Sequence, residues 1–456
     1  MEIKIAQFPS ITERRRISTL RKYGELYDNE AQAVLKLHNI IKKQFKDEAD
    51  IIYLAHAIPA RVSDFYGDLV QGDADKMSIK IKNGDEKENA LLEKILDDND
   101  LKEAVYDMAV DQSEFGYFAT TTRINDKGSS IIETVPQDQY FPQADGSVIF
   151  ATYKQDPAVR EMKSLLLFTQ NYERENGKVK ITRQAWTTDG MGVVTGTYDF
   201  AKMLEVLGEE YKQEEYLEID DLPIRQIDNG KRTKYGFGKS DYKDIMPQLA
   251  EINERATHIS TALLKNLNAK MALPSSAYDE NGNVAHTDSY EIDGKDEILP
   301  QYVSNNNPLL SETREHIVSE IKWVSWISGV PMSELLKSSA PETVESLRIQ
   351  LFPAVRRTDT KRSKIKKGLA DIIRIAFKLK GIDLTKNIII SFSDVLPVDA
   401  LQQANTESIK ITSGVTSKRS AMKRIENLND EEADAEMEEI DKENSIAGLG
   451  GPAPTI

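Results

Sequence analysis

Cysteine is absent from this 456-residue sequence, and histidine is scarce, with five residues in all. The lack of cysteine excludes disulfide bonds, thiolate catalysis and zinc sites with cysteine ligands, and it is typical of a reducing compartment. Long apolar runs are missing too. No stretch approaches about 18 apolar residues, so we expect no transmembrane helix. The N-terminal residues MEIKIAQFPSITERRR lack the apolar core of a secretory signal.

Positive charge is also in short supply. The chain has 75 acidic residues against 59 Lys and Arg residues, and its formal net charge is −16. A protein that binds nucleic acid over its whole surface is normally basic, so the net charge argues against tight binding of that kind. Loose handling of DNA is not excluded, because an acidic wall repels phosphates and lets a duplex slide.

The first half of the chain changes character near Phe115. Helical spacing of apolar residues covers 11–45, 50–72 and 87–112. From Phe115 to Ile227 short β-like runs follow one another, separated by turn pairs such as Asn176-Gly177. Such pairs are typical of hairpins, so we predict an antiparallel β region and an α+β fold that is mainly helical.

Two long helices around a polar insert come next. Apolar residues step by three or four from Ser240, a predicted N-cap, and Pro247 is expected to kink this first helix. The insert covers 270–308. The second helix ends at Gly329 and is followed by a small-residue loop, LLKSSAP, at 335–341.

A third helix is predicted from about Glu342 to Lys380, interrupted by Pro353. At helical rise it would span roughly 55 to 60 Å, which is too long for the core of one compact domain. We therefore expect support from neighbouring subunits or from a second layer. A strand at 387–392 and three short helices complete the chain, and the last helix is strongly acidic.

One motif resembles a phosphate-binding loop. Gly238-Lys239-Ser240 at a helix start fits part of the pattern, but the pattern needs glycine five residues before Gly238, where Thr233 stands. We favour a tight turn over a nucleotide site.

The histidines with nearby carboxylates form no convincing metal site. Glu254 with His258, and His316 between Glu312 and Glu320, have four-residue spacing. Carboxylate-bridged metal bundles instead use glutamate and histidine three residues apart. We predict surface ion pairs here, with no metal, no cofactor and no catalytic residues.

A basic run lies on the third helix. Its seven cations within 12 residues, with Asp359 as the one acid among them, are Arg356, Arg357, Lys361, Arg362, Lys364, Lys366 and Lys367. They could contact phosphate or an acidic neighbour, or form a solvated face balanced by the acidic C-terminal helix. We favour pairing between subunits over DNA. Trp323 and Trp326 are expected to be packing anchors rather than base-stacking platforms. The candidates for subunit contact are Trp323, Trp326, Arg356, Arg357, Lys361, Arg362 and Lys364.

Several segments together resemble tailed-bacteriophage portal proteins of the siphovirus-like family. LPIRQIDNGKRTKYGFGKSDYKDIMPQLAEINERATHIS is similar to the stretch in which a Pro-Ile strand and a Gly-x-Ser turn lead into the first stem helix. VPQDQYFPQADGSVIFATYKQ is similar to their β-rich wing, and ETVESLRIQLFPAVRRTDTKRSKIKKGLADIIRIAF to their long wing helix. The closing segment from FSDVLPVDALQQANTESIK onward also matches. The colinear order from about residue 20 to 444, rather than any single motif, carries the resemblance.

The resemblance implies a domain plan. It places a wing at 1–239, a first stem helix at 240–267, a clip at 268–308, a second stem helix at 309–329, a tunnel loop, long wing helix and return strand at 330–396, a crown at 397–444 and a disordered tail at 445–456. In the tunnel loop, Lys337, Ser338 and Ser339 would face DNA, and candidates to line the channel are Lys265, Lys270 and Lys322. Many relatives carry a Ser-Gly pair just before the long helix, where this chain has Ser339-Ala340-Pro341-Glu342, so its loop would be stiffer.

The resemblance also implies a function. Twelve copies would form a ring at one capsid vertex of the virion. The ring would be assembled in the host cytoplasm and would have no membrane partner. The ring would conduct double-stranded DNA without sequence specificity, and it would dock the terminase large subunit, a head-completion or adaptor protein, and the major capsid and scaffolding proteins. The alternatives are another structural virion ring, such as an adaptor or baseplate, or a metal-dependent nuclease or NTPase.

Overall fold

The chain divides into two compact units, which are described separately. The first comprises Met1–Ala340 and Gln350–Ser393, and the second Pro341–Ile349 and Asp394–Ile456. The computed structural model describes residues 8–30, 53–157, 165–189, 191–267, 270–272, 301–303, 309–332, 344–393, 400–425 and 430–447. No helix among these residues has the length and apolar character needed to cross a membrane.

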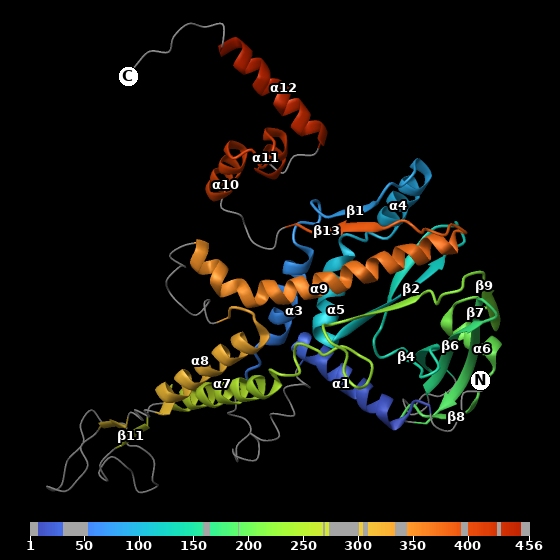
Figure 1. Ribbon diagram of the computed structural model, residues 1–456. Helices are drawn as coiled ribbons and strands as arrows, with labels where there is room; N and C mark the ends of the chain where they lie inside the picture. Colours follow the sequence, from blue (N-terminus) through green and yellow to red (C-terminus); the bar gives the residue numbers. More distant parts are fainter. Residues whose placement is uncertain are drawn as a thin grey trace, which may run out of the picture. The chain divides into compact units, whose positions relative to one another are not determined.

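Several helices lie in the first unit (Figure 1). They are α1 (Ile11–Tyr27), α3 (Ile58–Gln71), α4 (Glu86–Asp98), α5 (Ala104–Phe115) and α9 (Val344–Leu379), which enters the unit at Gln350. The long helix α9 was predicted closely, and its buried residues Ile365, Leu369 and Ile372 repeat at helical spacing. The helix predicted over 87–112 is instead two helices, because the chain turns at Asp100, whose φ is 43°. Residues 31–45 of the first predicted helix lie outside the described residues.

Two antiparallel sheets follow the helices, as the turn pairs predicted. The three-stranded sheet has the order β10-β2-β3, and the six-stranded sheet β4-β5-β6-β7-β8 with β9 paired to β7. The strands are β2 (Tyr117–Ile124), β3 (Ser130–Val135), β4 (Tyr140–Pro142), β5 (Val148–Gln155), β6 (Leu165–Glu175), β7 (Lys178–Thr188), β8 (Val194–Thr197), β9 (Glu214–Leu217) and β10 (Ile224–Asp228). Helix α6 (Phe200–Leu207) packs on the six-stranded sheet.

Strand alternation places the three-stranded sheet between two cores. Phe118 and Ile227 pair across β2 and β10 and face the core formed with α4, α5 and α9. Tyr117 and Ala119 face the core of the six-stranded sheet. Helix α9 comes close to β10 at Gly368, where a Cβ atom would lie 1.9 Å from Ile227 Cδ1. A larger residue at Gly368 would therefore force the Ile227 side chain to shift.

A strand pairing between distant segments closes this unit. Strand β1 (Ser78–Ile81) pairs antiparallel with β13 (Ile388–Ser391), so that Ser78 lies opposite Ser391. The sequence predicted β13 but not its partner.

Helices α7 (Met246–Leu267) and α8 (Leu309–Ser328) run side by side (Figure 1). Between them, β11 (Lys270–Ala272) pairs with β12 (Gln301–Val303). The prediction that the first helix begins at Ser240 is wrong. Ser240 is buried in a turn, where its Oγ accepts a hydrogen bond from Tyr242 N at 3.1 Å. Pro247 is consequently the second residue of α7, where its missing N–H costs nothing, so it does not kink the helix.

The second unit contains the three C-terminal helices that the sequence predicted. They are α10 (Ala400–Thr412), α11 (Lys418–Ile425) and α12 (Asp430–Ala447). Arg419 pairs with Asp434 at 2.5 Å and thereby joins α11 to α12. Ala421 on α11 and Ala433 on α12 are buried.

Candidate functional site

The turn before α7 is held in a fixed shape by its glycines. At Gly238 a Cβ atom would lie 2.0 Å from Gly116 O and 2.6 Å from Asn229 N, both of which are backbone atoms that cannot move away. Lys239 forms an ion pair with Asp244. The Gly-Lys-Ser segment is therefore a packed turn against the end of α5, as predicted, and its lysine is engaged locally.

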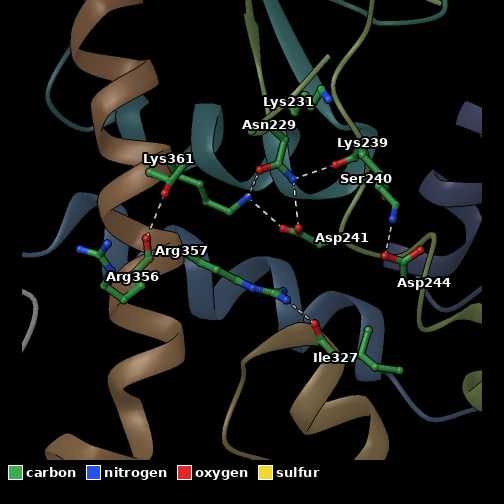
Figure 2. A pocket seen from close by; sticks show the side chains of 12 residues that line it. Asn229, Lys231, Lys239, Ser240, Asp241, Asp244, Ile327, Arg356, Arg357 and Lys361 are labelled. Carbon is green, nitrogen blue, oxygen red and sulfur yellow. Dashed lines mark hydrogen bonds and ion pairs between the residues drawn. The ribbon is translucent and has the colours of Figure 1, made fainter. Parts of the chain in front are cut away.

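A buried polar cluster joins this turn to the long helix (Figure 2). Lys361 on α9 is 3% exposed, and its Nζ lies 2.8 Å from Asp241 Oδ2 and 2.9 Å from Asn229 Oδ1. Asp241 also accepts hydrogen bonds from Ser113 Oγ at 2.8 Å and Asn229 Nδ2 at 3.0 Å. Burial lowers the pKa of Lys361, while the neighbouring Asp241 carboxylate opposes that shift.

The aromatic ring of Tyr66 completes the environment of this lysine. Its centroid lies 5.0 Å from Lys361 Nζ, so the ring face adds a cation–π contact. Its hydroxyl donates to Ser328 O at 2.6 Å. Three segments distant in sequence, α3, α9 and the turn before α7, therefore meet at one ammonium group.

Two arginines of α9 cap other helices. Arg357 donates to Ser328 O and Ile327 O, both at 2.5 Å, at the C-terminus of α8. Arg362 donates to Leu69 O at 2.8 Å and Val70 O at 3.0 Å, at the C-terminus of α3. The last carbonyls of a helix lack partners within it and carry partial negative charge, so a guanidinium stabilises them.

Two of the seven cations in the basic run are buried inside the subunit, and four are exposed. Lys361 and Arg362 are buried, and Arg357 is bonded to α8, although the sequence suggested these residues as subunit contacts. Arg356 and Lys364 are exposed. Contact of these residues with a neighbouring subunit stays a prediction, and Arg357, although bonded to α8, is exposed as well.

A cavity of about 540 Å³ opens beside the buried cluster (Figure 2). Its charged lining consists of Lys231, Lys239, Arg356, Arg357, Lys361, Asp241 and Asp244. The turn and the first half of α9 supply these residues, and Ile327 at the end of α8 adds an apolar part of the lining. Sequence reasoning missed Asn229, Asp241 and Ser113, since no local pattern distinguishes them from surface polar residues.

Comparisons with known proteins decide the family. The sequence model described as "Phage portal protein, SPP1 Gp6-like" matches residues 10–447. The chain belongs to this family of phage portal proteins. Portal proteins are structural components of phage-type particles, which accords with the prediction that the chain is not an enzyme.

Solved structures give a weaker likeness. Those similar to this portal chain include "Neck of empty GTA particle computed with C6 symmetry" and "Neck of native GTA particle computed with C12 symmetry", where GTA is a gene transfer agent. Their TM-scores are 0.46 and 0.44 and their identities 10% and 11%; the matches cover 81% of this chain and 90% and 89% of those chains. Because these TM-scores are low, the family assignment rests on the sequence model. No curated protein sequence matches the chain.

The two tryptophans of α8 do not anchor the core of this portal subunit, contrary to expectation. Trp323 is 52% and Trp326 75% exposed, and their rings meet edge to face at 5.7 Å. Val324 lies between them and is fully buried, so the helix turns its aliphatic face inward and its indoles outward. Subunit contact through the two indoles stays a prediction.

Carboxylates lie close to histidines on α7 and α8. His258 lies 3.7 Å from Glu254, as predicted, whereas His316 pairs across the two helices with Glu251 at 3.2 Å rather than with Glu312 or Glu320. Arg255, as the main cause, lowers the pKa of Glu251. The described residues contain no group of three or more potential ligands placed for a metal ion.

Of the remaining predicted site residues, Lys322 alone has a side chain that the structure describes. Lys322 is exposed on α8. Lys337, Ser338 and Ser339 lie outside the described residues, as do the side chains of Lys265 and Lys270. Their roles stay predictions.

Proposed function

We propose that twelve copies of this portal chain form a ring at one capsid vertex, through which double-stranded DNA passes during packaging and ejection. Family membership over residues 10–447 is the observation that carries this proposal. The joints on α9 support it, because Arg357 and Lys361 fix the long helix to the end of α8 and to the turn before α7.

The proposal assigns the helices and segments of the chain to the parts of a portal subunit. Helices α7 and α8 are the stem, residues 268–308 the clip, α9 the wing helix, and 397–444 the crown. The clip would dock the terminase large subunit and later a head-completion protein. The ring would also meet capsid and scaffolding proteins during assembly in the host cytoplasm.

DNA contact is assigned to a few residues. In the tunnel loop, Lys337, Ser338 and Ser339 would meet phosphates, and Lys265, Lys270 and Lys322 are further candidates along the channel. A net charge of −16 suits this task, since a conduit must let the duplex slide. The chain itself would hydrolyse nothing, and terminase would supply the energy from ATP.

The test is the mass and shape of the purified full-length protein. Native mass spectrometry should give twelve times the subunit mass of 51.4 kDa, and negative-stain images should show rings with a central channel. A chain that stays monomeric at high concentration would contradict the proposal.

A further inference from the structure

The cavity beside the Lys361–Asp241 pair carries more positive charge than its own carboxylates neutralise. Five cationic side chains line it against two carboxylates, Asp241 and Asp244. Asp241 is paired with Lys361, and Asp244 with Lys239. Three positive charges therefore remain in a space of about 540 Å³.

Two of these charges have no ion-pair partner among the described residues. Lys231, on the turn, and Arg356, on α9, are exposed and are among the residues that line the cavity. The third belongs to Arg357, whose donors reach carbonyl oxygens that carry only partial charge. Like charges held near one another in one concave site repel, so the bare cavity favours an anionic occupant.

The occupant must be small and must carry carboxylate or phosphate oxygens. A planar guanidinium such as that of Arg356 binds either group through two parallel hydrogen bonds. The cavity volume of about 540 Å³ is large enough for amino-acid side chains. It is far too small for a DNA duplex, so DNA could touch only the rim.

We propose that this cavity receives acidic side chains from a second copy of the chain, in the ring of the proposed function on which this inference rests. Charge complementarity selects the occupant. Each copy carries 75 acidic residues and a net charge of −16, so a neighbouring copy offers carboxylates to a site that holds three uncompensated cations. Binding of a neighbour's carboxylates in the cavity would offset part of the repulsion between two subunits that both carry net negative charge.

The experiment reverses the two free charges. Lys231→Glu with Arg356→Glu changes side chains that are exposed and unpaired, so the subunit should fold with unchanged circular dichroism and melting temperature. The matched control is Lys127→Glu with Lys367→Glu, which makes the same change in charge at exposed positions outside the cavity. Ring content is measured against subunit concentration by native mass spectrometry, without DNA.

The inference expects the cavity variant to need at least about tenfold more subunit for half-assembly, because charge-assisted contacts are lost. The control should assemble like the wild type. Raising salt should weaken wild-type rings and narrow the gap between the two proteins. If the cavity variant assembles like the control but retains less DNA, the occupant is a phosphate and the inference is wrong.

A second measurement identifies the partner directly. A zero-length carbodiimide crosslinker joins Lys231 Nζ to a carboxylate in contact with it. Rings assembled from a mixture of ¹⁴N- and ¹⁵N-labelled subunits should yield crosslinked peptide pairs of mixed label. Crosslinks found within one copy alone would overturn the inference. Failure of the wild type to form any ring is a separate outcome, which overturns the proposed function and the inference together.

Discussion

Lys361 Nζ lies 2.8 Å from Asp241 Oδ2, and both side chains are largely removed from solvent. A buried ion pair is stable only where further hydrogen bonds satisfy its polar atoms. Asn229 bonds to both partners, and Ser113 bonds to the carboxylate. The pair thus fixes α9 to the turn that leads into α7, and its removal should loosen that joint.

Lys361→Met should lower the free energy of unfolding by about 3 to 5 kcal/mol, because it leaves Asp241 buried without its cation. Lys361→Met with Asp241→Asn should be less harmful than the lysine change alone, since no uncompensated charge then remains. Urea unfolding of the wild type, both single variants and the double variant gives the coupling energy. Strictly additive effects would mean that the two groups do not act as a pair.

Glu114 on α5 should make stability depend on pH. It is 5% exposed, and burial, with Asp111 and Asp28 as further causes, raises its pKa from 4.5 to about 8. The folded state therefore keeps a proton that the unfolded state has lost throughout the range from pH 4.5 to 8. Stability must fall as pH rises through that range.

Glu114→Gln should remove this slope, with a gain on the order of 2 to 4 kcal/mol at pH 8 and little at pH 4.5. Melting temperatures from pH 5 to 8 test the prediction. Glu93→Gln on α4, at an exposed position, is the control. An equal gain in stability at pH 5 and pH 8 would mean that the raised pKa of Glu114 is not the cause of the pH dependence.

Patterns that are local in sequence predicted the local structure. The stripe of apolar residues gave α9 to within about two residues of its ends, because helix burial repeats every three or four residues. Asn176-Gly177 forms the expected hairpin turn, with φ of 51° and 80° at the two residues. The start of α7 was missed, since Ser240 bonds within a turn as readily as it caps a helix.

Partners that are distant in sequence were not predictable. Nothing in SIKI at 78–81 indicates that it pairs with 388–391. Lys361 and Lys364 also look alike in the sequence, although the first is buried against Asp241 and the second faces solvent. Which cations turn inward depends on the acceptors that tertiary contacts bring to the helix.

The glycines of the turn before α7 offer a matched pair of substitutions. Gly238→Ala should be strongly destabilising, because its Cβ would overlap backbone atoms of Gly116 and Asn229. Gly236 has a φ of 85° and no atom within 4 Å of an added Cβ, so Gly236→Ala should cost only about 1 to 2 kcal/mol for the backbone conformation. Thermal melts compare the two. An equal loss of stability in the two variants would mean that the turn can rearrange to accommodate a Cβ atom at Gly238.

The exposed tryptophans should report ring formation. The chain has three tryptophans, and Trp186 is buried at 3% exposure in the six-stranded sheet. If Trp323 and Trp326 pack on a neighbouring subunit, their emission should shift to shorter wavelength as rings form, while that of Trp186 stays constant. Trp323→Ala with Trp326→Ala should weaken rings and spare the subunit fold. An emission maximum that is the same in monomer and ring would exclude the contact.

Substitution of Lys337 in the proposed tunnel loop distinguishes a role in DNA contact from a role in ring assembly. Lys337→Ala should leave ring mass and melting temperature unchanged and should reduce the length of DNA that filled particles retain, because one ammonium per subunit would no longer meet phosphates. Lys337→Arg keeps the charge and should restore retention. The comparison is made by sizing DNA extracted from particles built with each variant. If the Lys337→Ala subunits fail to form rings, the lysine stabilises the ring rather than contacting DNA. If the rings form and the length of retained DNA is unchanged, Lys337 does not contact DNA.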